Sequence, residues 1–385
     1  MQKNYLSEKS ASSQPASDIF VVNGTAGNLH GLDKMLALMG QHGLRFYKSR
    51  TASHDKGPGG LIAAGDTIVI KVNSQWDQRG GPNTDLLKAL IRIIVEHPDG
   101  FAGEIVVADN GQDQYGSAGK GGNLDWSQNN AVDTTQSVQK VVDSFKNHRV
   151  STYLWDTITN TQVKEYGQGD QTDGYVVMPK PAPGNGFLVS YPKFKTKHGA
   201  FISLKKGVWN PETEKYDSRS LKIINLPTFK AHFIYGVTGC VKHYMGVVSD
   251  KLTAKLGARS HDLVGAGGMG TEIAGVRYPA LNILDATWVN AKPAGGPWTP
   301  FDAATWGDVI MAGTDPVAID YWAAKNVLMP LAREAGHKEL ASIDPDNTAD
   351  KTFGKWLRLA MGELNKAGFQ TTVDEKRMNI FVVEA

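Results

Sequence analysis

The feature that most constrains the fold is a strand–helix–strand pattern between residues 67 and 108. Residues 67–72 (TIVIKV) form a β-branched apolar run that predicts a buried strand. Residues 84–96 (TDLLKALIRIIVE) have the apolar spacing of a helix and follow Asn83, a candidate N-cap. Residues 104–108 (EIVVA) predict the next strand. Because a helix joins the two strands, we expect them to be parallel, with a right-handed crossover.

Strand and helix patterns also alternate along most of the remaining chain. Further strands are expected at 19–22, 221–226, 281–284, 308–311 and 378–383, and further helices at 30–39, 134–146, 241–248, 315–327 and 353–367. This order favours an α/β fold with a mostly parallel, doubly wound (Rossmann-like) sheet.

Residues 150–220 depart from this alternation. They hold short β-like runs at 151–155, 175–178, 187–191 and 201–204, which Gly and Pro separate. We therefore divide the chain into a flexible or disordered N-terminus (1–17), a first half of the α/β core (18–149), a β-rich insertion (150–220), a second half of the core that carries the site (221–330), and a C-terminal helix and strand that close the core (331–385).

Composition and charge exclude several classes of protein. The chain has 385 residues and a single cysteine, Cys240, so neither a disulfide scaffold nor an iron–sulfur cluster held by this chain is expected. Forty-one Lys and Arg residues against 39 Asp and Glu give a net charge of +2, which offers no electrostatic reason to bind nucleic acid. No apolar run reaches the roughly 18 residues that a membrane span needs.

Polar side chains follow the predicted strands. In parallel sheets ligands bind beyond the carboxyl ends of the strands, so side chains that gather there are candidates for a site. Asp315 precedes Pro316 and is expected to cap a helix. The candidates at this edge are Asn73, Asp109, Asn110, Lys230, His232 and Asp285, with Lys71 inside its strand. We predict His232, Lys230 and Asp109 as catalytic residues, and Asn73 and Lys71 as substrate-binding residues.

Residues 225–246 (NLPTFKAHFIYGVTGCVKHYMG) carry the densest polar pattern. A glycine-bounded turn that leads into a helix presents free backbone N–H groups, which suit an anion. Gly236, Thr238, Gly239 and Lys242 are therefore predicted to bind an anionic substrate. A Walker A loop is absent, and Cys240 is expected to be a small buried hydrophobic residue.

Histidines and carboxylates in the same half of the chain are compatible with a divalent metal site. His232, His243 and Asp285 are the candidate ligands, and His261 lies nearby in the sequence. No fixed ligand spacing such as HExxH accompanies them. The glycines of 265–270 fit the letters of GxGxxG but follow no clear strand, so a dinucleotide site is not predicted.

The motifs together resemble the domain-of-unknown-function family 362 (DUF362). The resemblance rests on IVIKVN with TDLLKALI, EIVVADNG, INLPTFKAH with GVTGCVKHYMG, His261 with LNILDA, and GDVIMAGTDPVAIDYWAA, over roughly residues 60–330. It implies a soluble α/β protein of bacteria or archaea, either cytoplasmic or exported after removal of a signal. Many members carry ferredoxin-type cysteines or a twin-arginine signal, and this sequence has neither.

A more distant similarity, of residue type alone, connects the chain with the lactate racemase family that carries a nickel-pincer cofactor. In that family His and Lys hold the cofactor between two α/β domains. The similarity implies Lys230, His232, Lys242 and His243 as counterparts.

Two functions follow as hypotheses. The first is an enzyme that acts on a small anionic substrate, with His232 as acid–base group or metal ligand and no certain cofactor. The second is an exported, non-catalytic protein that binds a solute or glycan through loop tryptophans, namely Trp288, Trp298 and Trp306. The partner expected in both is a small molecule, and the sequence makes no prediction about oligomeric state.

Overall fold

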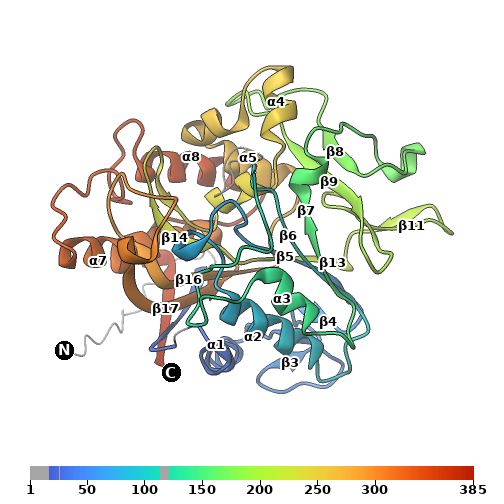
Figure 1. The fold of residues 1–385 in the computed structure, drawn as a ribbon, viewed down its shortest axis with the longest axis horizontal. Helices are drawn as coiled ribbons and strands as arrows, with labels where there is room; N and C mark the ends of the chain where they lie inside the picture. The colour runs from blue at the N-terminus through green and yellow to red at the C-terminus, as the bar shows by residue number, and fades with distance from the viewer. Residues whose placement is uncertain (1–16, 26, 113–120) are drawn as a thin grey trace.

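In the computed structural model, which describes residues 17–25, 27–112 and 121–385, a large sheet runs through the centre of the molecule (Figure 1). In spatial order its strands are β18 (Met378–Glu384), β1 (Ser17–Asn23), β17 (Thr305–Gly313), β16 (Leu281–Asn290), β13 (Leu221–Asn225), β5 (Thr67–Lys71), β6 (Glu104–Asp109) and β7 (Val150–Leu154). β14 (Thr228–His232) and β15 (Gly236–Thr238) pair beside β16.

The strands from β16 to β7 are all parallel, which confirms the predicted βαβ unit and the mostly parallel sheet. β17 runs antiparallel to both of its neighbours, so the sheet as a whole is mixed. The Rossmann-like, doubly wound arrangement remains a prediction.

Helices cover both faces of this sheet (Figure 1). Strand alternation makes this possible: Ile68 and Ile70 of β5 face one hydrophobic core, and Val69 faces the other. The first core holds α1 (Leu29–Gln41), α2 (Thr84–Val95) and α3 (Val138–Asp143). The second holds α4 (Asp250–Leu256), α5 (Gly268–Gly275), α6 (Pro316–Ala323), α7 (Met329–Glu334) and α8 (Phe353–Lys366).

A second sheet lies at one end of the molecule. It is antiparallel, with the order β12 (Lys215–Asp217), β11 (Gly207–Asn210), β10 (Phe201–Ser203), β9 (Ser190–Lys195) and β8 (Gly174–Val177). The β-rich character expected after residue 150 is therefore present, but the run at 151–155 differs from the expectation. It forms β7, which pairs with β6 in the central sheet, so the second sheet begins later. A small third sheet joins β3 (Lys56–Gly57), β2 (Tyr47–Lys48) and β4 (Ile62–Ala63).

Three predicted helices differ from the structure. The helix expected at 134–146 is limited to α3, whose N-cap is Ser137. Residues 242–246 form a 3₁₀ turn and not an α-helix. The helix expected at 315–327 begins after Asp315, which caps it as predicted by accepting from the N–H groups of Val317 and Ala318, and continues through a π-turn (324–328) into α7.

Glycines explain the close approach of α5 and α8. A Cβ on Gly270 would lie 2.2 Å from the carbonyl oxygen of Ala360. The segment before α5 is a 3₁₀ turn (260–266) and not a strand, so the GxGxxG letters here serve helix packing. The predicted flexible N-terminus lies, apart from Ser17, outside the described residues.

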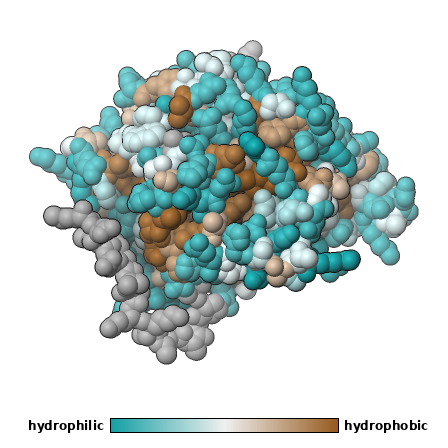
Figure 2. Space-filling view, turned by 90° about the horizontal axis from the view of Figure 1, so that it is seen from below, coloured by the Kyte–Doolittle hydropathy of each residue, from teal (hydrophilic) through white to brown (hydrophobic). Residues whose placement is uncertain are grey.

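None of the helices described is both long and apolar enough to cross a membrane. Seen from below, the surface is largely hydrophilic, and hydrophobic residues reach it in a band across the middle (Figure 2).

Candidate functional site

A small, polar cavity lies at the carboxyl edge of β5 and β6. Its volume is about 30 Å³, which is room for one or two waters. Seven of the residues that the sequence predicts for the site line it. They are Lys71, Asn73, Asp109, Lys230, Thr238, Lys242 and His243. Asn110 also lies in the wall, together with Gln75, Trp76, Gln112, Met245, Gly246 and Pro297.

An ion pair forms one wall of this cavity. Lys71 Nζ lies 2.6 Å from Asp109 Oδ1 and donates to the carbonyl oxygen of Val72 at 2.9 Å. The backbone N–H and the hydroxyl of Ser74 both donate to Asp109 Oδ2, at 2.6 and 2.9 Å. Burial raises the pKa of Asp109, against the opposing effects of Lys71 and Ser74. Because both of its oxygens are already engaged, Asp109 positions Lys71 and is not free to act as a base.

Gly246 makes room for this ion pair. A Cβ at that position would lie 2.1 Å from Asp109 Oδ1 and 2.4 Å from Lys71 Nζ. No real Cβ contact is that short, so a side chain here would have to separate the two charges.

Two further lysines face the cavity without an ion-pair partner among the described residues. Lys230 donates to the carbonyl oxygen of Gly80 and is almost fully buried. Lys242 is 5% exposed, and its ammonium lies 5.6 Å from the ring centre of Tyr235. Burial, with a smaller contribution from neighbouring lysines, lowers the pKa of each lysine to about 7. The charges of Asp285 at Lys230 and of Asp250 at Lys242 act in the opposite direction.

His243 presents an acceptor nitrogen beside these lysines. Asn225 donates its Nδ2 to Cys240 O and to Asn282 Oδ1, so its Oδ1 must accept, and it lies 2.6 Å from His243 Nδ1. His243 Nδ1 therefore carries the proton, and Nε2 is left with a lone pair. Nε2 is buried and has no hydrogen-bond partner among the described residues. Burial, and then the charge of Lys71, lower the pKa of His243 well below 6.5.

Two other donors face the cavity. Asn73 Oδ1 accepts from the N–H of Thr228 at 2.8 Å, which leaves its Nδ2 group as a donor. The hydroxyl of Thr238 is buried and unpartnered within the described part of the chain. Three cations, an amide, a hydroxyl and an imidazole lone pair thus surround one small space, against a single carboxylate.

His232, predicted as catalytic, lies outside this cavity. Its Nδ1 accepts from the N–H groups of Ile234 and Tyr235 in the β14–β15 turn, so Nε2 carries the proton. Burial, and then Lys242, lower the pKa of His232 well below 6.5. The Nδ1 lone pair of His232 is therefore used to form the turn, and the imidazole that lines the cavity is that of His243.

The predicted anion-binding turn is also used internally. The N–H groups of Cys240 and Val241 donate to the carboxylate of Asp320, at 2.6 and 2.9 Å. A Cβ on Gly239 would lie 2.3 Å from this carboxylate, so the glycine admits Asp320 and not a substrate. Gly236 has a positive φ of 73°, and its Cα packs against the carbonyl of Ser342. Cys240 is buried as predicted.

Asp285 lies inside β16, because that strand continues to Asn290. Its oxygens accept from Asn83, Asn130 and the N–H of Thr287, and Asp285 does not line the cavity, although its charge raises the pKa of Lys230. The predicted metal ligands His232, His243 and Asp285 are not brought together. No group of three or more His, Cys, Asp or Glu side chains in residues 17–25, 27–112 and 121–385 is placed to hold a metal ion.

The sequence reasoning missed Ser74, Asn225 and Gly246. Ser74 directly follows Asn73 beyond the end of the strand, and this position was a usable signal. Asn225 is the last residue of a strand that is otherwise apolar, and that position was a usable signal. The role of Gly246 depends on a contact between distant segments, which no local pattern shows.

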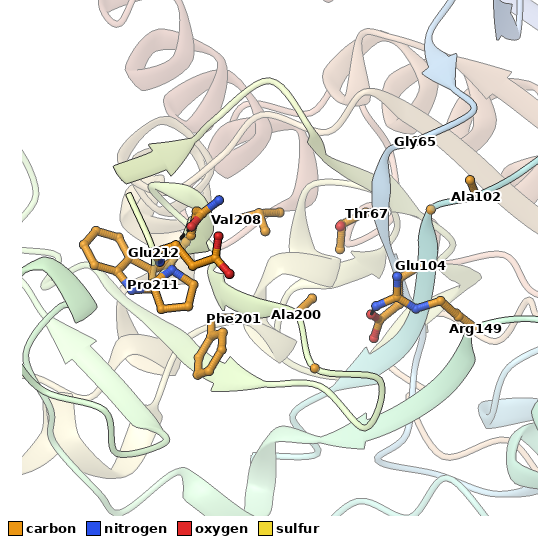
Figure 3. Close-up of a pocket in the computed structure, with 14 residues that line it drawn as sticks. Gly65, Thr67, Ala102, Glu104, Arg149, Ala200, Phe201, Val208, Pro211 and Glu212 are labelled. Atoms are coloured by element: carbon orange, nitrogen blue, oxygen red, sulfur yellow. Dashed lines mark hydrogen bonds and ion pairs between the residues drawn. The ribbon is translucent and has the colours of Figure 1, made fainter. Parts of the chain in front are cut away.

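A larger hollow lies at the opposite edge of the sheet, between the amino ends of β5 and β6 and the second sheet (Figure 3). Its volume is about 430 Å³. Glu104 and Arg149, paired at 2.9 Å, face Phe201 and Val208 across it (Figure 3). Trp209 in its wall is packed against Tyr166 and Tyr216.

The loop tryptophans line neither hollow. Trp288 packs edge-on against Trp306, and the guanidinium of Arg79 lies 4.1 Å from the ring centre of Trp288. Trp298 and Trp306 are partly exposed, at 53% and 41%. Since Trp288 is covered by its neighbours, the three rings do not form one open stacking platform.

Comparison with known proteins gives one match. Residues 218–325, which run from the start of β13 to the π-turn after α6, match the family model described as Domain of unknown function (DUF362). No curated protein and no solved structure matches the chain. The matched segment contains four residues of the cavity wall, Lys230, Thr238, Lys242 and His243. The match over residues 218–325 confirms the resemblance to DUF362 found in the sequence.

Proposed function

We propose that the protein is an enzyme that binds a small carboxylate or comparable anion in the cavity and carries out acid–base chemistry on it. The observation that carries the proposal is the pair of buried lysines, Lys230 and Lys242, which have no ion-pair partner among the described residues and lie beside the lone pair of His243. A buried ammonium without a counter-charge is unfavourable, and an anionic ligand would supply that charge.

The roles follow from the hydrogen bonds that are already made. Lys230 and the Nδ2 group of Asn73 bind the anion, and Thr238 adds a hydroxyl. His243 Nε2 accepts a proton from the substrate, and Asn225 keeps the imidazole in the tautomer that this requires. Lys71 is held by Asp109 and contributes positive potential. No metal ion enters this proposal, because the described residues gather no ligand set for one.

The position in the sheet supports the same proposal. From β5 the chain adds β6 and β7 on one side and then returns to add β13 and β16 on the other. If the sheet is doubly wound, the order reverses between β5 and β13, and ligands in such folds bind beyond the strand ends at this point. Lys71 and Asn225 end these two strands, and Lys71 lines the cavity.

The test is to measure anion binding by calorimetry at pH 6.5, with acetate, oxalate and phosphate as the probes. We expect at least one probe to bind, and Lys230→Met to weaken binding at least tenfold. Lys180→Met, at an exposed position, is the matched control and should bind as the unaltered protein does. Affinity should fall as the pH rises above about 7, because the lysines then lose their charge. Binding that is absent, or unchanged in Lys230→Met, would refute the proposal.

A further inference from the structure

Lys242 differs from the other two lysines of the cavity because its nitrogen has no hydrogen-bond or ion-pair partner among the described residues. Lys71 has Asp109 and Val72 O, and Lys230 has Gly80 O. The Lys242 side chain is 5% exposed, and its nearest described aromatic partner, Tyr235, offers only a ring face at 5.6 Å. An amine in this position can be uncharged without losing an ion pair, and its lone pair is then available for bonding.

The same cavity supplies the groups that a reaction at this nitrogen would need. Lys230 and the Asn73 amide can hold a carboxylate. The Thr238 hydroxyl and His243 Nε2 are both buried and unpartnered in the described part of the chain. In a 2-oxo acid the carbonyl carbon is one bond from the carboxylate, so a neighbouring lysine can reach it while another binds the carboxylate.

We infer that Lys242 forms an imine with the carbonyl carbon of a compact 2-oxo carboxylate. This inference rests on the proposed function, because it uses the same cavity and the same anion-binding lysine.

The step balances without an oxidant or reductant. The lone pair of the Lys242 amine attacks the carbonyl carbon, a C–N bond forms, and the π pair of the C=O bond moves to the oxygen, which is protonated. His243 Nε2 takes one proton from the nitrogen and passes it to that oxygen, which gives a hydroxyl. It then transfers the second nitrogen proton to the hydroxyl, which leaves as water while the nitrogen lone pair forms the C=N bond. The products are the imine and one water.

A low amine pKa supports this step. Burial and the charge of Lys71 lower the pKa of Lys242 to about 7, so a large fraction is uncharged near neutral pH. Desolvation and a neighbouring cation are the two means by which nucleophilic lysines are activated.

The experiment is reductive trapping. The protein is incubated at pH 7.5 with pyruvate or glyoxylate and sodium cyanoborohydride, and the site of labelling is found by peptide mass spectrometry. We expect one reduced adduct per chain, on Lys242. Lys242→Arg keeps the positive charge but is not a nucleophile, so it should lose that adduct. Lys180→Arg, at an exposed site, is the matched control and should keep it.

A parallel measurement separates the two proposals. Binding of the unreactive anion oxalate is measured in the same preparations. If oxalate binds and protects no lysine, and labelling is spread over surface lysines equally in Lys242→Arg, the imine is refuted while the anion site stands. If oxalate does not bind and no adduct forms, the proposed function fails as well. A single adduct on Lys242 that oxalate suppresses supports both.

Discussion

Replacing Lys242 with methionine should make the protein more stable, by an amount that depends on pH. Burial lowers the pKa of Lys242 from 10.5 to about 7. A charged Lys242 therefore destabilises the folded state by up to about 5 kcal/mol relative to an exposed lysine. Methionine is unbranched and of similar length, so it should fill the same space without the charge.

The pH dependence follows from proton binding. The unfolded chain keeps the Lys242 proton up to about pH 10.5, and the folded chain keeps it only up to about pH 7. Below pH 7 both states are protonated, and the full penalty applies. Between these values the unfolded chain binds more protons, so the stability of the unaltered protein rises with pH. The gain from Lys242→Met should thus be about 4 kcal/mol at pH 7 and about 2 kcal/mol at pH 9, both as upper limits.

Urea denaturation at the two pH values measures this difference. Lys180→Met, at an exposed position, should change the free energy of unfolding by less than about 0.5 kcal/mol at either pH. A loss of stability in Lys242→Met, or a gain of equal size at both pH values, would show that the buried ammonium is not the source of the effect.

Three further outcomes are expected. Gly246→Ala should destabilise the fold by about 3 kcal/mol or more, because the added methyl group separates a buried ion pair. The control Gly362→Ala lies in α8 with open space around it and should stabilise the fold by up to about 1 kcal/mol. Thermal denaturation compares the two variants. Asn225→Ala should lower the free energy of unfolding, measured in urea, by about 3 kcal/mol, since three buried hydrogen bonds lose a partner. The fold keeps His243 uncharged, so protonation below pH 6.5 favours the unfolded state. His243→Gln should therefore reduce the slope of the free energy of unfolding against pH, between pH 5 and 6.5, by about 1 kcal/mol per pH unit. An unchanged slope would contradict the low pKa of His243.

Several residues predicted from the sequence line one cavity because a single rule brings strand ends together. Parallel strands bring their carboxyl ends to one edge, whatever the details of the loops. Once residues 67–72 and 104–108 are identified as neighbouring strands, Lys71, Asn73 and Asp109 must lie near one another. The approach of Lys230 and Lys242 from the second half of the chain required only that β13 pair with β5, which the buried apolar run at 221–226 made reasonable.

The choice between His232 and His243 could not be made from the sequence. Both histidines are buried, and they differ in how their Nδ1 atoms are used. His232 Nδ1 accepts from the turn that follows it, and His243 Nδ1 donates to Asn225. The first depends on the backbone conformation of a hairpin and the second on a contact 18 residues away. Likewise, the N–H groups of Cys240 and Val241 donate to the carboxylate of Asp320, which lies about 80 residues further along the chain.

The strongest physical argument for a ligand is that two of the three buried lysines do not stabilise the fold. Within the part of the chain that the structure describes, only Lys71 has a carboxylate at ion-pair distance, and Lys230 and Lys242 are buried without one. Apolar side chains of the same volume would pack at both positions without the loss in stability. On the proposed function, a bound anion supplies the negative charge that Lys230 and Lys242 lack at ion-pair distance among the described residues. Such a ligand would bind the folded state alone, so a small anion at this cavity should also raise the melting temperature, and by more the tighter it binds.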